Sequence, residues 1–187
     1  MSADRDAIID RLFHEQNDVV AFLRENQQLS FSINVEAILS KTLLLSIGSY
    51  FESRITTSIT DYAARVSKSD EALTSLVRVK AVERQYHTYF QWREGKRSAT
   101  PFFGMFGPGL KDAAKEDLKD EGLAQASQAF LELGDLRNLL VHGNFANYSL
   151  PKTSDEIYSL YGVALQFVTY IEKKLDPMPT LASCGDS

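Results

Sequence analysis

The chain is poor in cysteine and histidine. Its 187 residues contain one cysteine, Cys184, and three histidines. A single cysteine cannot close an intrachain disulfide, and no HxxxH, HExxH or Cys/His cluster with zinc-ligand spacing is present. His14 and His87 stand alone on amphipathic stretches and are interpreted as ordinary surface or half-buried side chains. We therefore expect no metal or other cofactor. The amino-terminal sequence lacks the basic-then-apolar order of a signal peptide, so we expect a cytoplasmic protein.

Long apolar runs are absent as well. The longest candidate, Ala37–Ile47, is interrupted by Lys41 and Ser46, so we expect no membrane span. The sequence has no strand-type alternation, no Gly-rich phosphate loop and no G-x-S-x-G motif, which argues against nucleotide-cofactor enzymes and α/β hydrolases. A net charge of -5 argues against nucleic-acid binding by the whole surface. An RNA would therefore need a local basic cleft.

What the sequence does contain is helical periodicity. Apolar residues recur at spacings of three and four, the pattern of amphipathic helices. The predicted helices cover residues 4–25, 32–66, 71–92, 111–121, 123–142 and 155–175. Thr153 and Glu156 have the spacing of a capping box at the start of the last helix. We expect one all-α domain over residues 1–175 and a disordered tail over residues 176–187.

Residues 93–109 interrupt this periodicity. They hold four glycines and two of the five prolines, which predicts a long irregular insertion with one short turn around Phe103–Phe106. Arg93, Lys96 and Arg97 are interleaved there with aromatic residues, a combination that can follow an RNA backbone and stack unpaired bases. The alternative is that the aromatic rings fold onto the core and only the charges are solvated. That alternative is favoured for the phenylalanines, whereas both interpretations remain open for the three basic residues.

A polar motif lies within the predicted helix 123–142. Arg137, Asn138 and His142 follow the pattern R-N-x-x-x-H inside an apolar stretch. Asn138 and His142 are four residues apart and project from the same side of a helix, and Arg137 borders that side. Gly143 follows where helices commonly end with a left-handed residue, which places His142 in the last turn. We expect a guanidinium, an amide and an imidazole together at the end of a mostly buried helix.

This pattern resembles the R-x4-6-H signature of the HEPN superfamily, small all-α domains found in prokaryotic toxins, antiviral effectors and RNA-processing factors, many of them metal-independent ribonucleases. The signature commonly has a polar residue after the arginine, here Asn138. One HEPN branch is regulated by modification of a tyrosine two residues after the histidine. Asn144 stands there instead, so the chain is more similar to the stand-alone or RiboL-PSP type. The resemblance implies an up-and-down helical bundle with the long insertion, dimeric through the motif helix.

The motif suits RNA cleavage. RNA carries a nucleophile in its 2′-hydroxyl, so cleavage needs a base for that hydroxyl, an acid for the leaving oxygen and positive charge near the phosphate. His142 can fill either proton-transfer role, Arg137 can bind phosphate oxygens, and Asn138 can orient either group. One histidine cannot be acid and base at once. The resemblance implies that two protomers form a composite cleft with two copies of Arg137 and His142, so that the second His142 supplies the other proton-transfer group.

A structural interpretation competes with the catalytic one. Arg137 can pair with an acidic side chain such as Glu52, and His142 gains from the dipole at the end of its helix. The residues alone favour this interpretation, whereas the HEPN resemblance favours catalysis, with Glu52 and Arg54 as structural support of the site. We therefore expect a metal-independent endoribonuclease, acting as a toxin or antiviral defence effector on an RNA substrate, alongside an antitoxin or other defence-system partner. The alternative is a non-catalytic helical module that dimerises, holds RNA or binds an antitoxin.

Overall fold

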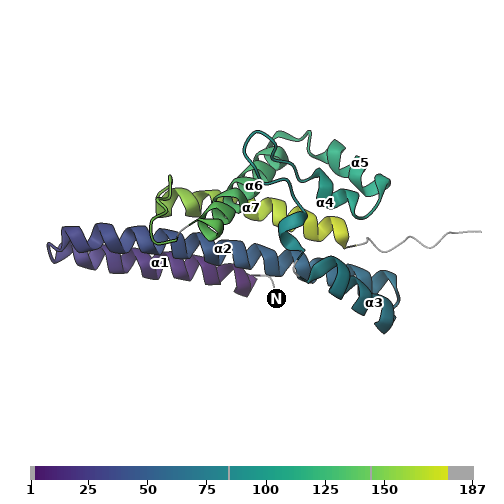
Figure 1. The fold of residues 1–187 in the computed structure, drawn as a ribbon, viewed down its shortest axis with the longest axis horizontal. Coiled ribbons are helices and arrows are strands. Elements are labelled where there is room, and N and C mark those ends of the chain that lie inside the picture. Colours follow the sequence, from purple (N-terminus) through teal and green to yellow (C-terminus); the bar gives the residue numbers. More distant parts are fainter. Residues whose placement is uncertain (1–2, 84, 144, 177–187) are drawn as a thin grey trace, which may run out of the picture.

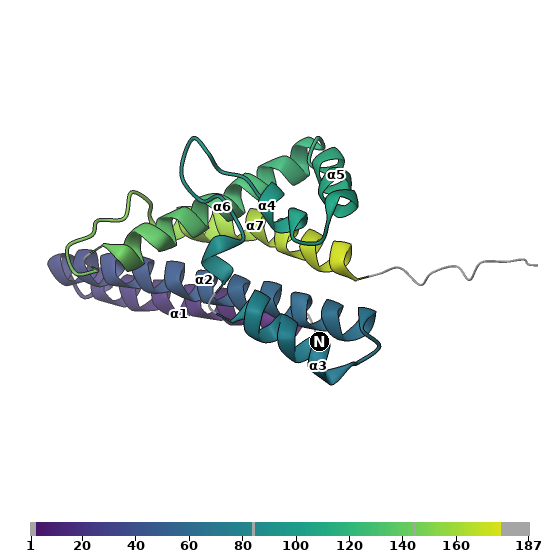
Figure 2. The same cartoon turned by 45° about the vertical axis from the view of Figure 1, so that its right-hand side comes forward.

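The fold is built from two helix pairs and a smaller cap. It is taken from a computed structural model, which describes residues 3–83, 85–143 and 145–176. The α-helices in chain order are α1 (Ala3–Glu25), α2 (Leu29–Val66), α3 (Glu71–Val77), α4 (Thr100–Gly104), α5 (Pro108–Asp117), α6 (Glu121–His142) and α7 (Ser154–Leu175). α1 and α2 form a long antiparallel hairpin (Figure 1). α6 and α7 form a second pair, which packs on α2 (Figure 2). The predicted all-α bundle is confirmed.

α2 is the central helix, and the sequence-based prediction of one long helix is confirmed. Its weakest stretch in helix propensity contains the β-branched residues 55–57, 59 and 60. Several hydroxyl groups there bond back to the carbonyl four residues earlier: Thr56 to Glu52 at 2.7 Å and Thr60 to Thr56 at 3.0 Å. These bonds satisfy the polar side chains within the helix, while Ile55 and Ile59 are buried at 0% and 2% exposure.

The core lies where α2 meets α6 and α7. Phe130 of α6 is its centre, with Phe51 of α2 at 5.7 Å and Phe167 of α7 at 5.4 Å between ring centroids. Ring pairs at such distances add to the hydrophobic gain of burial. The buried face of α6 therefore packs against α2 and α7, which leaves the opposite side of the helix for its polar residues.

α2 also has the length and apolar composition of a membrane-crossing helix. Core helices of bundles pass the same test, and here Leu43, Leu44 and Ile47 are fully buried against the rest of the bundle. Lys41 and Arg54 lie on the same helix and are buried among protein groups, each with a hydrogen-bond partner. The core therefore accounts for part of the apolar surface of α2, whereas Leu29, Phe31, Ile33 and Ile38 near its amino end are exposed.

The predicted third helix, 71–92, is wrong beyond residue 82. α3 is capped as predicted by Asp70, whose carboxylate accepts from the Leu73 amide at 2.8 Å, and one π-turn over Arg78–Val82 extends it. The chain then turns away. The aromatic residues that follow are buried where the chain folds against α6, with Tyr89 at 1% and Phe90 at 4% exposure and the Phe90 ring 5.0 Å from that of Phe130.

The insertion is more regular than predicted. An isolated β-bridge joins Gln91 and Ser98, α4 begins earlier than the predicted turn around Phe103–Phe106, and α5 begins at Pro108, where proline suits a first helical turn. Phe102 and Phe103 are fully buried, so the core interpretation of these phenylalanines is confirmed. The insertion is thereby fixed to the bundle.

The last helix starts as the sequence predicts. Thr153 and Glu156 form the complete capping box, with the Thr153 amide donating to the Glu156 carboxylate at 2.8 Å. The Thr153 hydroxyl also donates to this carboxylate at 3.1 Å, and the two bonds from Thr153 hold the pKa of Glu156 below its ordinary value. α7 ends at Leu175. The predicted tail 176–187, apart from Asp176, and its Cys184 lie outside the described residues.

Candidate active site

The motif lies on the exposed side of α6, near its carboxyl end. Arg137 and Asn138 are half-buried and His142 is exposed. The Arg137 guanidinium donates to the Asn138 side-chain oxygen at 3.2 Å. The structure therefore brings the arginine and the amide together, and places the histidine one turn further along the same side, as the four-residue spacing requires.

Arg137 is held in place from α2. Its guanidinium lies 3.6 Å from the Glu52 carboxylate, and both side chains are partly solvent-exposed, at 27% and 39%. The stem of Arg137 crosses α2 at Gly48, where a Cβ atom would come within 3.1 Å of the Arg137 Cγ. Glu52 is thus the acidic partner of Arg137, and Gly48 provides the space for the crossing. An exposed pair of this kind contributes about 0–1 kcal/mol to stability, so its main effect is to orient the guanidinium.

The chain after His142 is anchored back to α2. The Lys41 ammonium donates to the Phe145 carbonyl at 2.7 Å and lies 5.1 Å from the centre of the Phe145 ring. Gly143 does not adopt the left-handed conformation that the sequence predicts, because its φ of -83° is ordinary. Glycine is favoured at this position for steric reasons, because a Cβ atom there would lie 2.8 Å from the Leu139 carbonyl oxygen.

Residues 86–92, which we call the 86–92 segment, cover the turn of α6 that precedes the motif. The Trp92 indole lies so close to Gly134 that a Cβ atom on that glycine would fall 2.1 Å from the Trp92 Cζ3. A small pocket lies beneath, lined by Gly48, Phe51, Tyr86, Trp92, Phe130, Leu133, Gly134, Arg137 and Asn138. Burial raises the pKa of the Tyr86 hydroxyl, and the Glu52 charge raises it further while Arg137 opposes it. The neutral phenol therefore persists beside the motif at physiological pH.

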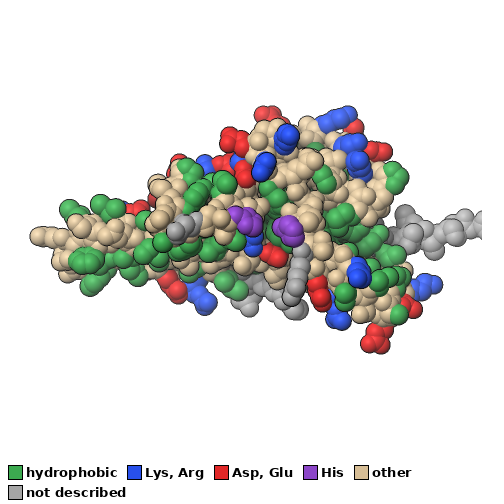
Figure 3. All heavy atoms as spheres, in the orientation of Figure 1, with side chains coloured by type: hydrophobic (Ala, Val, Ile, Leu, Met, Phe, Trp, Pro, Cys, Tyr) green, Lys and Arg blue, Asp and Glu red, His purple; other side chains and the backbone are tan. Residues whose placement is uncertain are grey.

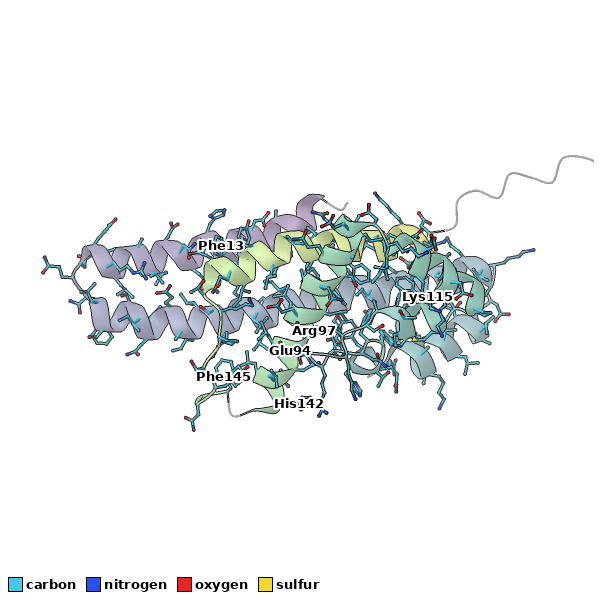
Figure 4. The ribbon with its side chains drawn as sticks, turned by 90° about the horizontal axis from the view of Figure 1, so that it is seen from above. Phe13, Glu94, Arg97, Lys115, His142 and Phe145 are labelled. Carbon is cyan, nitrogen blue, oxygen red and sulfur yellow. The ribbon has the colours of Figure 1, made fainter. Side chains whose placement is uncertain are left out.

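The three predicted RNA-binding residues are placed differently from one another. Arg93 and Lys96 are exposed. Arg97 forms an ion pair with Asp135 of α6 at 3.0 Å, and the two side chains are only 19% and 13% exposed. Figure 4 shows Arg97 beside the middle of α6 and His142 at its end. Arg97 therefore fixes the insertion to the motif helix, whereas Arg93 and Lys96 are available to solvent.

Arg54 is not brought to the motif helix. It turns toward α7, where its Nε donates to the Glu172 carboxylate at 2.7 Å, and its guanidinium also donates to the Tyr50 hydroxyl at 3.2 Å. Arg54 and Glu52 are two residues apart on α2, so they point to different sides of the helix. Glu52 therefore contacts Arg137 of the motif, whereas Arg54 joins α2 to α7.

Sequence reasoning missed the contribution of the 86–92 segment. Tyr86 was predicted to lie on the apolar face of a helix and Trp92 at the end of that helix, whereas both line the pocket beside Arg137 and Asn138. Tyr86, Tyr89 and Phe90 have the i, i+3, i+4 spacing of a helix face, so their pattern does not indicate that the helix ends. Gly134 carries the available signal, since glycine in a helix interior is unfavourable without a packing reason.

Comparison with known protein families agrees with this geometry. In the described ranges, no group of three or more His, Cys, Asp or Glu side chains is placed to hold a metal ion. No curated protein and no solved structure gives a significant match to the chain. The family model described as RiboL-PSP-HEPN matches residues 10–176, which include most of α1, all of α2 to α7 and the whole motif. The chain therefore belongs to the RiboL-PSP-HEPN family, and its all-α bundle is a HEPN-like fold.

Proposed function

We propose that the protein is a metal-independent endoribonuclease, active in the cytoplasm as a toxin or antiviral defence effector. The observation that carries the proposal is the side of α6 on which Arg137 and Asn138 are hydrogen-bonded and the exposed His142 follows one turn later, with Arg137 oriented by Glu52. Membership of a family in which ribonucleases are common supports it.

The three side chains divide the work of the reaction. Arg137 presents a planar set of donors that matches the oxygens of a phosphodiester, and its charge stabilises the additional negative charge of the transition state. His142 exchanges a proton with either the attacking or the leaving oxygen. Asn138 accepts from Arg137 through its side-chain oxygen, and its amide nitrogen can donate to an acceptor such as a phosphate oxygen.

The proposal includes a homodimer. Leu139, Val141 and Phe145 surround His142 with apolar surface, at 51%, 49% and 43% exposure. A second copy that covers these side chains would bring two motif helices together and remove apolar surface from water. The competing function is a non-catalytic helical module. The Arg137–Glu52 pair supports that alternative, because a purely structural motif would also form it.

The cleavage products test the proposal. Attack by the 2′-hydroxyl leaves a 2′,3′-cyclic phosphate on one fragment and a 5′-hydroxyl on the other. Purified protein incubated with cellular RNA should yield these ends, in EDTA as well as in magnesium, and should leave 2′-deoxy or 2′-methoxy linkages uncut. End-specific sequencing identifies the termini. Fragments with 5′-phosphates would contradict this mechanism, and the absence of new ends would favour the non-catalytic module.

Neutralising the exposed basic residues of the insertion should weaken RNA binding. Because each phosphate contact contributes about 0.7 to the salt slope for a single strand, Arg93→Gln with Lys96→Gln should flatten the plot of log K against log salt by about 1.4. Binding measured across a salt series checks this. Lys115 and Lys119 offer a matched control, since both are exposed and Lys115 lies far from His142 in Figure 4. An equal effect of both double variants would mean that the RNA has no preferred path over the insertion.

A further inference from the structure

Two cationic side chains are buried in the described part of the chain, and only one of them has a carboxylate partner. Lys41 and Arg54, both on α2, are 8% and 9% exposed. Arg54 is compensated by the carboxylate of Glu172. The Lys41 ammonium donates to the Phe145 carbonyl at 2.7 Å, and none of the ion pairs among the described residues includes it. A buried charge without a counter-ion is unfavourable, so an anion beside Lys41 would be stabilising.

Lys41 lines a cavity that has room for such an anion. The cavity has a volume of about 260 Å³ and lies between α2 and the chain that joins α6 to α7. Since a water molecule occupies about 30 Å³ in the liquid, a group several times larger fits inside. The polar side chains that line it are those of Ser40, Lys41, Asn147, Tyr148, Ser149 and Lys152.

The charge around this cavity is positive. Lys152 pairs with Glu132 of α6 at 2.9 Å, so these two charges offset each other and the charge of Lys41 remains. Asn147 and Ser149 are exposed and carry further hydrogen-bond donors. Figure 3 shows mainly apolar and uncharged side chains over the α1–α2 hairpin and the chain between α6 and α7. An anion on this side would therefore be held by Lys41 and not by a general basic surface.

The cavity adjoins the end of the motif helix. The Tyr148 ring lies against Gly143, the residue after His142, because a Cβ atom on that glycine would be 3.7 Å from the Tyr148 Cδ2. Lys41 holds the same stretch of chain through Phe145, and Figure 4 shows Phe145 and His142 at this end of α6. All the lining residues come from one chain, so each protomer of a composite cleft would contribute one such cavity.

We propose that the cavity binds a second phosphate of the RNA strand, beside the one that is cut, with Lys41 as its counter-ion. This deepens the proposed ribonuclease function and rests on it. A strand cleaved at the motif lies along the end of α6, which brings a neighbouring phosphate to the buried ammonium. The Tyr148 ring offers a stacking surface for the adjoining base. Lysine binds phosphate as a point charge, so the cavity adds affinity and fixes the position of the strand without reading its sequence.

A double-mutant cycle between Lys41 and the strand tests the proposal. The probe is a single-stranded RNA that spans a cleavage site mapped by end-specific sequencing and carries a 2′-methoxy group there, so that it binds uncut. Neutral methylphosphonate linkages replace its phosphates one at a time. At a linkage beside the cut, the replacement should weaken wild-type binding by about 10-fold, whereas Lys41→Gln should bind this RNA and the unmodified RNA equally.

Two further variants separate the charge of Lys41 from its anchoring of the loop. Lys41→Met keeps the length of the stem without the charge and should lose the coupling in the same way as Lys41→Gln. Lys115→Gln is the matched control, because Lys115 is an exposed lysine of α5 that lies far from His142 in Figure 4. It should show the wild-type response to every linkage.

The outcomes distinguish the cavity from the function on which it rests. A lysine that only anchors the loop would weaken binding by the same factor at every linkage, so additive effects throughout overturn the proposal while RNA cleavage leaves the ribonuclease function standing. Competition by inorganic phosphate that depends on Lys41, without coupling to any linkage, would assign the cavity to free phosphate and also overturns it. A wild-type protein that cleaves no RNA overturns the ribonuclease function, and this proposal with it.

Discussion

Replacing His142 or Arg137 with alanine should abolish RNA cleavage without unfolding the protein. Loss of a proton-transfer group costs about 10²–10⁴-fold in rate, and loss of a donor to the transition-state charge costs about 10²–10³-fold. Both positions lie on the surface of α6, and His142 is exposed, so the change in free energy of unfolding should stay within about 1 kcal/mol. Single-turnover cleavage rates and thermal melts of the same samples measure the two quantities.

The charge and the shape of the Arg137 side chain can be separated. Arg137→Lys retains a positive charge but not the planar fork that binds two phosphate oxygens, so its activity should lie between those of wild type and Arg137→Ala. Arg24→Ala is a suitable control because Arg24 forms an exposed ion pair with Glu36 at 2.7 Å, between α1 and α2. If the motif variants lose activity only in proportion to lost helical signal, the catalytic assignment fails.

Gly134→Ala should displace the 86–92 segment and destabilise the fold. A methyl group at this position would overlap the Trp92 ring, with a Cβ–Cζ3 separation of 2.1 Å, so the indole must move. Overpacking of this kind costs about 1–3 kcal/mol. Trp92 is the only tryptophan in the chain, so its fluorescence reports the displacement directly, and denaturant titration reports the stability. Because the indole also lines the pocket beside Arg137 and Asn138, RNA cleavage should fall in parallel.

Gly162→Ala supplies the comparison. Gly162 lies inside α7, and a Cβ atom there meets nothing within 4 Å. Alanine in an open helical position is stabilising by about 0.5–1 kcal/mol relative to glycine. The same substitution is therefore expected to have opposite signs at the two glycines. Equal effects would show that Trp92 does not lie against α6 in solution.

Local patterns predicted those parts of the fold whose causes are local. The start of α7 followed from Thr153 and Glu156, because a capping box is complete within one turn. The motif face of α6 followed from the spacing of Asn138 and His142, because helical geometry alone sets it. The pairing of Arg137 with Glu52 was also anticipated, since both lie on helices that the pattern identified.

The remaining features depend on contacts between distant residues. The helix predicted to reach Trp92 ends early because burial of its aromatic residues against α6 outweighs local propensity, and a single sequence does not display that competition. Arg54 and Glu52 looked equivalent in the sequence, but a two-residue offset on α2 sends one to α7 and the other to the motif.

The eight-residue register from Gly134 through Asn138 to His142 limits how α6 can vary among relatives. A one-residue insertion or deletion between these positions would rotate everything beyond it by about 100°, which would point the imidazole away from the tryptophan contact. The α1–α2 turn has no comparable constraint, because it projects past the other helices in Figure 1. Members of this family should therefore differ in length at the α1–α2 turn. They should keep the spacing of Gly134, Asn138 and His142 even where the apolar residues of α6 are exchanged.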